Sequence, residues 1–376
     1  METIEKKKKK KRERQEIIAS FSKKPVEDTY IDKEVKKIKD IYHTIVTEIK
    51  EETPDVKTFT LTADKNSDTP CLAPFKAGQY ITIHVTVDDS PVTRAYSLSS
   101  APSLANKDSY KITIKRVENG LVSNYMLDQI KVGDHLDVSK PAGNFGYNPI
   151  RDEENVIAIA GGSGITPFMS LAWAILEGNY QCQLTVFYSV KTYEDIIFKK
   201  EIEEINKKNK GVKFIITLTR EEKEGYLNGH LTKEMLEPYI KEFNTVLMCG
   251  PKELYRSMNE LLNEFNIPRK SVHYENFFVE YEPEEKTTYN LKVVMKEKVE
   301  KITCRNDETL LVAMERAGIK APSLCRVGEC GYCRSRLLEG KVKMIGASLK
   351  KAEAENDYIH PCVSFPDSDI VLKLDI

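Results

Sequence analysis

The chain has 376 residues, of which 40% are hydrophobic, and its 57 Lys and Arg nearly balance its 58 Asp and Glu. Such a length predicts two or three domains, and the charge balance argues against a polyanion such as nucleic acid as a dedicated partner of the body of the protein. No apolar run approaches the roughly 18 residues of a membrane-spanning helix, and no apolar segment follows the basic N-terminus as in a secretory signal. We therefore expect a cytoplasmic protein.

Residues 1–40 form a basic N-terminal arm that contains an unbroken run of Lys and Arg at residues 6–12. Like charges repel one another along a chain, so we expect this arm to be flexible. A solvated tail is one interpretation. The other is peripheral contact with an acidic partner or with an anionic membrane surface.

Short segments of alternating polar and apolar residues follow, and we assign residues 41–150 to a first domain. Turn-forming clusters at residues 65–70 and 88–91 separate some of these segments. The pattern is typical of an antiparallel barrel. Strands are expected at residues 58–61, 80–87, 94–99 and 110–117.

The third of these expected strands carries Arg94, Ala95, Tyr96 and Ser97. A planar isoalloxazine ring can stack on the tyrosine, and an arginine can bind a phosphate through two hydrogen bonds. The serine can reach the N5 region of such a ring. Arg and Tyr are also common on exposed strand faces, so the tetrapeptide alone is a weak indication of a flavin site.

A second segment strengthens this interpretation. Lys115 ends a strand-like run, and Gly120 precedes a predicted helix that contains Val122 and Ser123. The N–H groups at the start of a helix attract an anion, and Ser123 adds a hydroxyl. The two segments together predict a flavin site.

Residues 151–280 have a different pattern, in which apolar strand-like runs alternate with helical segments. This alternation predicts a parallel sheet that is covered by helices on both faces. Strands are expected at residues 156–160, 184–189, 214–219 and 246–249, and helices at residues 167–176, 193–207, 231–240 and 252–265.

A glycine-rich turn joins the first of these strands to its helix and contains Gly161, Gly162, Gly164, Thr166 and Pro167. Glycines allow a pyrophosphate to approach the backbone closely. Threonine suits the N-cap of the helix, and proline suits its first turn. The alternative is an ordinary glycine-rich turn without a ligand.

Cys249, Gly250 and Pro251 end the last of these strands and begin a helix. Ligands of open α/β sheets bind at this edge. The default interpretation of a lone cysteine is a buried structural residue. No catalytic His and Asp partners are apparent, so a nucleophilic role is not expected.

A polar linker at residues 281–287 leads to a last domain, residues 288–376, which contains Cys325, Cys330, Cys333 and Cys362. The spacing C-x4-C-x2-C followed by a distant fourth cysteine is that of a plant-type 2Fe-2S cluster. Gly328 and Gly331 would let backbone N–H groups reach the cluster sulfurs. A zinc site is the alternative, but such sites usually show two C-x2-C pairs. A helix at residues 308–317 and a strand, turn and strand at residues 335–342 are also expected.

The last domain looks like a plant-type ferredoxin domain, a family with the β-grasp fold. The two nucleotide motifs resemble those of the ferredoxin-NADP reductase superfamily, and the resemblance covers about residues 41–376. It implies an antiparallel six-stranded flavin-binding barrel followed by a parallel α/β nucleotide-binding domain. The flavin contacts it implies are Arg94, Ala95, Tyr96, Ser97, Lys115, Gly120, Val122 and Ser123.

The same resemblance places the glycine-rich turn at the NAD(P) pyrophosphate. It places Cys249, Gly250 and Pro251 next to the nicotinamide. Glu275 and Phe277 would approach the flavin, and the carboxylate would orient the cofactor or handle a proton. With Cys249 and Ser97, Glu275 completes the expected catalytic set.

The choice of pyridine nucleotide stays open at this point. Arg220, Lys191 and Lys223 offer cations for the 2′-phosphate of NADPH, whereas Glu194 or Asp195 would suit NADH. Relatives with a C-terminal ferredoxin domain are more often linked to NADH, which favours NADH slightly. FAD is favoured over FMN, although some relatives with this domain order hold FMN.

The resemblance implies an oxidoreductase that passes electrons from NAD(P)H through FAD and the 2Fe-2S cluster to a separate electron-accepting protein, either an oxygenase or another metalloprotein. A second interpretation runs the same path in reverse, as a reductase of NAD(P)+ that draws on a low-potential carrier. A zinc-containing nucleic-acid-binding protein would use the basic run, but it leaves both nucleotide motifs unexplained. The polar linker would allow the cluster to face the flavin in one state and the acceptor in another.

Overall fold

The structure is a computed structural model that describes residues 40–208, 210–240, 244–277, 279, 281–296, 298–346 and 349–374. The basic arm expected at residues 1–40 lies outside these residues, except for its last one. Residues from Ile41 onward belong to one unit by their contacts. Among the described residues, no helix combines the length and the apolar character needed to cross a bilayer.

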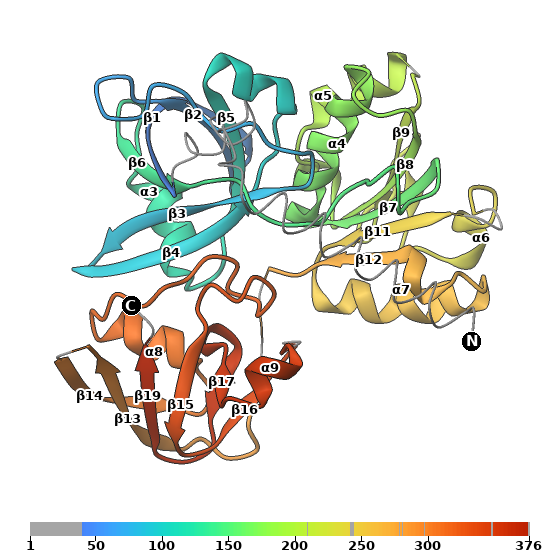
Figure 1. Cartoon of the computed structure of the whole chain (residues 1–376). Coiled ribbons are helices and arrows are strands. Elements are labelled where there is room, and N and C mark those ends of the chain that lie inside the picture. The colour runs from blue at the N-terminus through green and yellow to red at the C-terminus, as the bar shows by residue number, and fades with distance from the viewer. Residues whose placement is uncertain are drawn as a thin grey trace, which may run out of the picture. The chain divides into compact units, whose positions relative to one another are not determined.

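Six antiparallel strands form the first sheet, in the order β4-β3-β6-β1-β2-β5 (Figure 1). Leu98, directly after β4, forms a bridge to Ile112 of β5, which joins the two ends of the sheet. The expected six-stranded antiparallel barrel is therefore confirmed. The strands are β1 (Ile41–Thr53), β2 (Val56–Ala63), β3 (Tyr80–Val87), β4 (Ser90–Ser97), β5 (Ser109–Lys115) and β6 (His135–Ser139).

The barrel core follows the period of two that strands require, because every second side chain of a strand points to the same face. Ile81 and Ile83 of β3 and Ile112 and Ile114 of β5 are fully buried. The 3-10 helix η1 (Pro102–Lys107) and the helix α3 (Leu121–Asp128) complete this part of the chain. Strands β1 and β6 were not among the expected strands, because polar residues interrupt the first and the second is short.

The second sheet has six parallel strands in the order β10-β9-β8-β7-β11-β12. This arrangement confirms the expected parallel α/β domain. The strands are β7 (Asn155–Gly161), β8 (Gln183–Val190), β9 (Val212–Leu218), β10 (Leu227–Asn228), β11 (Thr245–Cys249) and β12 (Val272–Glu275).

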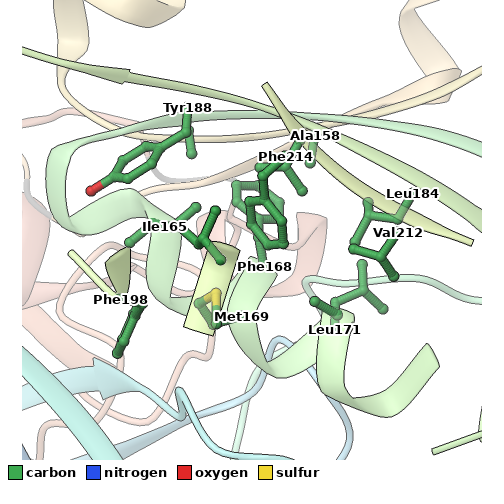
Figure 2. Packing of buried hydrophobic residues seen from close by; sticks show 14 of the residues in the cluster. Ala158, Ile165, Phe168, Met169, Leu171, Leu184, Tyr188, Phe198, Val212 and Phe214 are labelled. Carbon is green, nitrogen blue, oxygen red and sulfur yellow. The ribbon is translucent and has the colours of Figure 1, made fainter. Parts of the chain in front are cut away.

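Helices cover both faces of this sheet (Figure 1). Figure 2 shows Phe168, Met169 and Leu171 of one helix packed in a cluster with Leu184 and Val212 of the sheet. The helices are α4 (Thr166–Leu176) and α5 (Lys199–Lys208) on one face and α6 (Lys233–Leu236) and α7 (Lys252–Glu264) on the other.

Local details of this domain differ from the expectations. The helix expected at residues 193–207 is broken into η3 (Tyr193–Asp195) and α5, because Ile196 and Ile197 turn into the core and Phe198 takes a left-handed φ of 60°. The helix expected at residues 231–240 is reduced to the short α6.

The expected N-cap at Thr166 is wrong. The 3-10 helix η2 (Gly162–Ile165) runs directly into α4, so Ile165 is the N-cap, and the Thr166 hydroxyl donates to the Ser163 carbonyl at 3.1 Å. Pro167 does lie in the first turn of α4, as expected.

The last part of the chain forms a mixed five-stranded sheet in the order β14-β13-β19-β15-β17 and a two-stranded sheet of β16 and β18. Strands β13 and β19 are parallel, and α8 packs in the same core, which confirms the β-grasp expectation. The elements are β13 (Thr288–Met295), β14 (Lys298–Arg305), α8 (Leu310–Arg316), β15 (Ser335–Glu339), β16 (Val342–Met344), α9 (Lys351–Ala354), β17 (Tyr358–Ile359), η5 (Pro361–Val363), β18 (Ser364–Pro366) and β19 (Ile370–Leu374).

Candidate functional site

The strand expected to bind flavin is β4, and it contains a buried hydroxyl with a free hydrogen-bonding capacity. Ser97 is 3% exposed, and its Oγ has no hydrogen-bond partner within the described part of the chain. Leaving a buried polar group unpaired costs about 1–3 kcal/mol. Tyr96 packs against the barrel core, and burial raises the pKa of its phenol to about 12. An unpaired hydroxyl beside a neutral aromatic ring fits a flavin ligand.

The guanidinium of Arg94 lies on the same strand and has partners that the sequence did not suggest. Its Nη1 donates to the Thr93 carbonyl at 2.7 Å and lies 3.7 Å from Oε2 of Glu315 on α8. Burial, followed by the nearby charge of Arg326, lowers the pKa of Arg94 to about 10. Arg94 therefore lies at the contact between the barrel and the cysteine-containing domain.

The start of helix α3 lies next to this strand, as the sequence suggested. Gly120 is the N-cap of α3, and a Cβ at this position would lie 2.5 Å from Oγ of Ser123. Val122 belongs to the same buried cluster as Tyr96. Lys115 differs from the other expected contacts, because its ammonium lies 3.3 Å from Asp55 and is thereby partly neutralised.

The glycine-rich turn after β7 and the turn after β11 lie against each other at one edge of the parallel sheet. A Cβ on Gly164 would lie 2.1 Å from the Cys249 carbonyl oxygen, and one on Gly250 would lie 3.0 Å from the Gly161 nitrogen. Pro251 follows as the N-cap of α7. The strand order reverses between β7 and β11, which is where open α/β sheets bind their ligands.

The thiol of Cys249 is fully buried at this edge. Burial, followed by the charge of Glu275, raises the pKa of this thiol well above its usual value. A neutral thiol is a poor nucleophile, which agrees with a positioning role. Tyr255, which the sequence reasoning missed, links the turn after β11 to the end of β12: its hydroxyl accepts from the Gly250 N–H at 3.0 Å and donates to the Glu275 carbonyl at 2.5 Å. Its position early in α7, soon after Pro251, was the available signal.

Glu275 ends β12 beside Cys249 and carries a second unpaired buried atom. Its Oε2 has no hydrogen-bond partner among the described residues. Burial, and next the charge of Glu329, raise the pKa of Glu275 well above its usual value. This carboxyl group therefore keeps its proton at pH values where an exposed glutamate has lost it.

Two pockets lie where parts of the chain meet, and one of them is lined by all three parts. One, of about 360 Å³, is lined by Tyr80 and Phe145 of the barrel domain, by Glu275, and by Glu329 of the cysteine loop, which we define as residues 325–333. The other, of about 230 Å³, is lined by residues that include Gly250, Tyr255, Phe277 and Val327. The cysteine loop thus borders both pockets next to the nucleotide motifs.

The residues considered for the 2′-phosphate lie around the carboxyl ends of β8 and β9. Arg220 is exposed, and its backbone N–H donates to the Lys191 carbonyl at 2.9 Å. Asp195 accepts hydrogen bonds from the N–H and the hydroxyl of Thr192 at 2.9 and 2.8 Å. Lys223 lies 4.1 Å from the centre of the Tyr193 ring. The carboxylate of Asp195 is thus occupied by local capping.

The four cysteines of the last domain converge although Cys362 is distant in sequence. The sulfurs of Cys333 and Cys362 are 3.3 Å apart, and hydrogen bonds from the thiols of Cys330 and Cys362 lower the pKa of Cys325. Four thiols gathered in one place are the donor set that a 2Fe-2S cluster requires.

The backbone of the cysteine loop agrees with this chemistry. Gly328 and Gly331 have φ values of 77° and 68°. The N–H groups of Cys330 and Tyr332 point to the sulfurs of Cys325 and Cys330, each at 3.4 Å. His360, which the sequence reasoning missed, is buried, and its Nδ1 donates to the Gly328 carbonyl at 2.9 Å. The histidine therefore fixes one of the two glycine turns.

Three family models match successive parts of the chain. They are the oxidoreductase FAD-binding domain at residues 43–147, the oxidoreductase NAD-binding domain at residues 158–260, and the 2Fe-2S iron-sulfur cluster binding domain at residues 294–367. The matches agree with the order of the three large sheets. The protein accordingly has domains for FAD, for NAD and for a 2Fe-2S cluster.

Relatives match almost the whole length. A glycine betaine monooxygenase reductase subunit from Chromohalobacter salexigens is 30% identical in an alignment over 348 residues, and the match covers 86% of this chain and 92% of the relative. The NADH oxidoreductase HCR of Escherichia coli is 28% identical over 86% of this chain and 95% of its own length.

Among solved structures, phthalate dioxygenase reductase has the same fold, with a TM-score of 0.67, 24% identity, and coverage of 89% of this chain and 98% of that one. The motifs, the fold and these matches agree. The chain belongs to the ferredoxin-NADP reductase superfamily, as an oxidoreductase that passes electrons from NAD(P)H through FAD and a C-terminal 2Fe-2S cluster to a separate acceptor protein.

Proposed function

We propose that this protein is the reductase component of an oxygenase system and that it uses NADH. The names of the relatives support the acceptor and the nucleotide, and the electron relay is supported by the shared pocket, where Tyr80 of the barrel domain, Glu275 of the nucleotide domain and Glu329 of the cysteine loop lie together. The proposed flavin, nucleotide and cluster regions all border this pocket, which suits the transfer of electrons from one cofactor to the next. When bound, the cofactors supply the redox chemistry, since flavin accepts a hydride and releases single electrons.

In this proposal the barrel holds the flavin and keeps its ring in place. The ring of Tyr96 provides a flat apolar surface, and the unpaired hydroxyl of Ser97 provides a hydrogen bond. Ala95 lies directly before Tyr96 on β4. The N-terminal turn of α3, with Gly120, Val122 and Ser123, attracts phosphate, and Arg94 adds a positive charge although it also lies 3.7 Å from Glu315. Lys115 is the weakest member of this set, because Asp55 already engages it.

The nucleotide domain binds and orients NADH at the edge between β7 and β11. Gly162 borders open space that a pyrophosphate can use, whereas Gly161 and Gly164 let this turn lie against the turn after β11. Thr166 and Pro167 begin the helix that follows. Cys249, Gly250 and Pro251 shape the nicotinamide side together with Phe277. Glu275 lies on the same side, where burial raises the pKa of its carboxyl group.

The nucleotide preference can be tested by kinetics. The name of the E. coli relative, NADH oxidoreductase, supports NADH. We expect a higher kcat/KM with NADH than with NADPH, and we expect Arg220→Ala to leave the NADH value unchanged while it lowers the NADPH value. A higher value with NADPH would contradict this part of the proposal.

The acceptor is proposed to be an oxygenase, because the first matched relatives are named as monooxygenase reductase subunits. The test is capture of partners from the native source, followed by NADH-driven reduction of the captured protein. Reduction that requires the cluster supports the proposal. A captured metalloprotein that is not an oxygenase but is reduced in the same way would change the acceptor and leave the relay intact.

The reverse direction, from a low-potential carrier to NAD(P)+, is a second candidate function. Midpoint potentials of the flavin and the cluster separate the two directions. A cluster potential above that of NADH supports delivery to an acceptor. A cluster potential well below it supports the reverse path.

The domain limits 41–150, 151–280 and 288–376 belong to the proposal as well, and limited proteolysis tests them.

A further inference from the structure

Three charged side chains form a cluster between strand β4, which carries the expected flavin contacts, and the cysteine loop. Glu315 of α8 is only 8% exposed in its side chain. Arg326, next to Cys325, donates to both of its carboxylate oxygens, at 2.5 and 2.9 Å. Arg94 approaches Oε2 of the same carboxylate from β4 at 3.7 Å. Glu315 therefore joins the barrel to the loop, where α8 lies against β4 (Figure 1).

Hydrogen bonds between uncharged groups reinforce the same contact. The hydroxyls of Thr93 and Ser323 are 2.6 Å apart, and Thr82 donates to the Leu324 carbonyl at 3.1 Å. Ser323 and Leu324 directly precede Cys325 in the sequence. The residues that lead into the cysteine loop are therefore tied to strands β3 and β4.

Apolar packing completes this contact. Tyr80 at the start of β3 shares a small buried cluster with Cys325 and Val327. Tyr80 also lines the pocket that contains Glu275 and Glu329. The inner side of the cysteine loop, which carries Cys325 and Val327, therefore packs on the barrel beside the proposed flavin position.

The charge balance of the cluster makes Glu315 its central member. One carboxylate faces two guanidinium groups, and Arg326 is 11% exposed in its side chain. Charges in such a buried position are screened little by salt. Without the carboxylate, Arg94 and Arg326 would repel each other across the contact. Attraction between the two parts of the chain would then become repulsion.

We infer that Glu315 is a positioning residue for electron transfer from the flavin to the 2Fe-2S cluster. By bridging Arg326 and Arg94, it holds the inner side of the cysteine loop against the strand that carries the flavin contacts. The inference rests on the proposed function. In the step concerned, the flavin is oxidised by one electron and one ferric iron of the cluster is reduced to ferrous iron, and no bond to the protein forms or breaks.

The outer side of the loop stays accessible in this arrangement. Tyr332 is 57% exposed, and Cys330 is exposed as well. The linker is fixed to the cysteine-containing domain, because Tyr281 packs edge-on against Phe365 with ring centres 5.2 Å apart and Lys286 pairs with Asp307 at 3.1 Å. An acceptor can therefore reach the loop while Glu315 keeps its inner side in place.

The test uses the holoenzyme with Glu315→Gln, which keeps the size of the side chain and removes its charge. Glu308→Gln is the matched control, since Glu308 is a buried carboxylate of the same domain that pairs with Arg316 at 2.7 Å. Each protein is mixed rapidly with NADH without oxygen, and reduction of the flavin and of the cluster are followed separately. A parallel hydrogen-exchange measurement follows the amides of residues 80–97 and 323–327.

We expect Glu315→Gln to slow cluster reduction about ten- to a hundredfold, in line with the cost of small misplacements of reacting groups. Flavin reduction by NADH and the electron paramagnetic resonance spectrum of the reduced cluster should not change. Amide exchange should rise on both sides of the contact. The control should leave cluster reduction and exchange at that contact as in the wild type.

Unchanged cluster reduction in Glu315→Gln, or an equal loss in the Glu308 control, would overturn the inference. Failure of the wild type to reduce its flavin with NADH would instead overturn the proposed function. If Glu315→Gln does not fold, Thr93→Val decides the question, because it removes the hydroxyl contact to Ser323 from the barrel side and leaves the cysteine-containing domain unaltered. Wild-type cluster reduction in that variant would count against a positioning contact.

Discussion

The turn after β7 and the cysteine loop both depend on glycine, but for different physical reasons. In the turn after β7, a Cβ on Gly164 would lie 2.1 Å from a backbone oxygen of the neighbouring turn. In the cysteine loop, a Cβ on Gly331 would meet nothing closer than 3.8 Å, whereas its φ is 68°. The first glycine is required by close approach of two backbones, and the second by a left-handed backbone conformation.

The difference shows how each region accommodates its ligand. Two turns of the parallel sheet lie in contact at the edge between β7 and β11, where we propose that the nucleotide binds. The cysteine loop instead folds back on itself so that N–H groups point at sulfur. Substitutions at the two regions should therefore fail in different ways, and four predictions test this contrast.

The largest effect is expected for Cys330→Ser, which removes one of the four thiols in the loop. The cluster should be lost, because a serine hydroxyl is a poor substitute for a soft thiolate ligand. Reduction of the acceptor should be abolished, while ferricyanide reduction, which needs only the flavin, should persist. Visible spectra and the two activities check this, with Cys71→Ser as a control at another exposed cysteine. Loss of both activities would argue against a separable flavin module.

Gly164→Ala should damage the nucleotide site. The added methyl must push against the Cys249 carbonyl, and overpacking of this kind costs about 1–3 kcal/mol. We expect a lower melting temperature and a higher KM for NADH. Gly178→Ala is the control, because that position has a φ of 81° and open space around it. Equal KM values in the two variants would show that contact between the turns does not shape the site.

A smaller effect is expected for Gly331→Ala, in which only the backbone conformation is unfavourable. A left-handed conformation costs an ordinary residue about 1–2 kcal/mol. The cluster should still assemble, with lower stability measured by thermal unfolding. Gly331→Asn should be milder, since asparagine tolerates this conformation better. If a steric clash rather than the backbone conformation were the cause, the larger asparagine would destabilise the protein more than alanine does.

The smallest effect is expected for Glu275→Gln, and it should appear as a change in how the stability of the folded protein depends on pH. Because the folded protein raises the pKa of Glu275, it binds the proton more tightly than the unfolded chain does. Stability should therefore fall as the pH rises above the unfolded pKa of about 4.3 toward the folded value. Glu275→Gln should flatten this decline, measured by melting temperature against pH. Glu224→Gln, at an exposed position, is the control, and parallel curves for wild type and Glu275→Gln would contradict the prediction.

Local patterns predicted much of the fold and of the candidate site. The spacing of Cys325, Cys330 and Cys333 indicated a plant-type cluster loop because its ligands are close together in the sequence. The alternation of strands and helices indicated the parallel sheet for the same reason. The N-cap at Thr166 was wrong because the 3-10 helix η2 runs directly into α4. The helix expected at residues 193–207 is broken because tertiary packing of Ile196 and Ile197 overrode the local helical pattern. The expected domain limits and the individual cofactor contacts stay predictions.

Local patterns could not predict the contacts between segments that are distant in the sequence. Thr93 meets Ser323, and Arg94 meets Glu315, although more than half of the chain separates each pair. Tyr255 and His360 also act through backbone groups of other elements. Apart from Arg94, none of these side chains belongs to a local motif.

The flavin motif, the nucleotide motif and the spacing of Cys325, Cys330 and Cys333 are local patterns, so the chemistry of the protein could be inferred from its amino-acid sequence. How these motifs meet depends on tertiary contacts, with Glu315 between Arg94 and Arg326 and with Oε2 of Glu275 lacking a hydrogen bond from the described residues beside a shared pocket. The physical reason is that ligand spacing and backbone conformation are short-range properties. Burial and charge pairing depend instead on which distant surfaces come into contact when the chain folds.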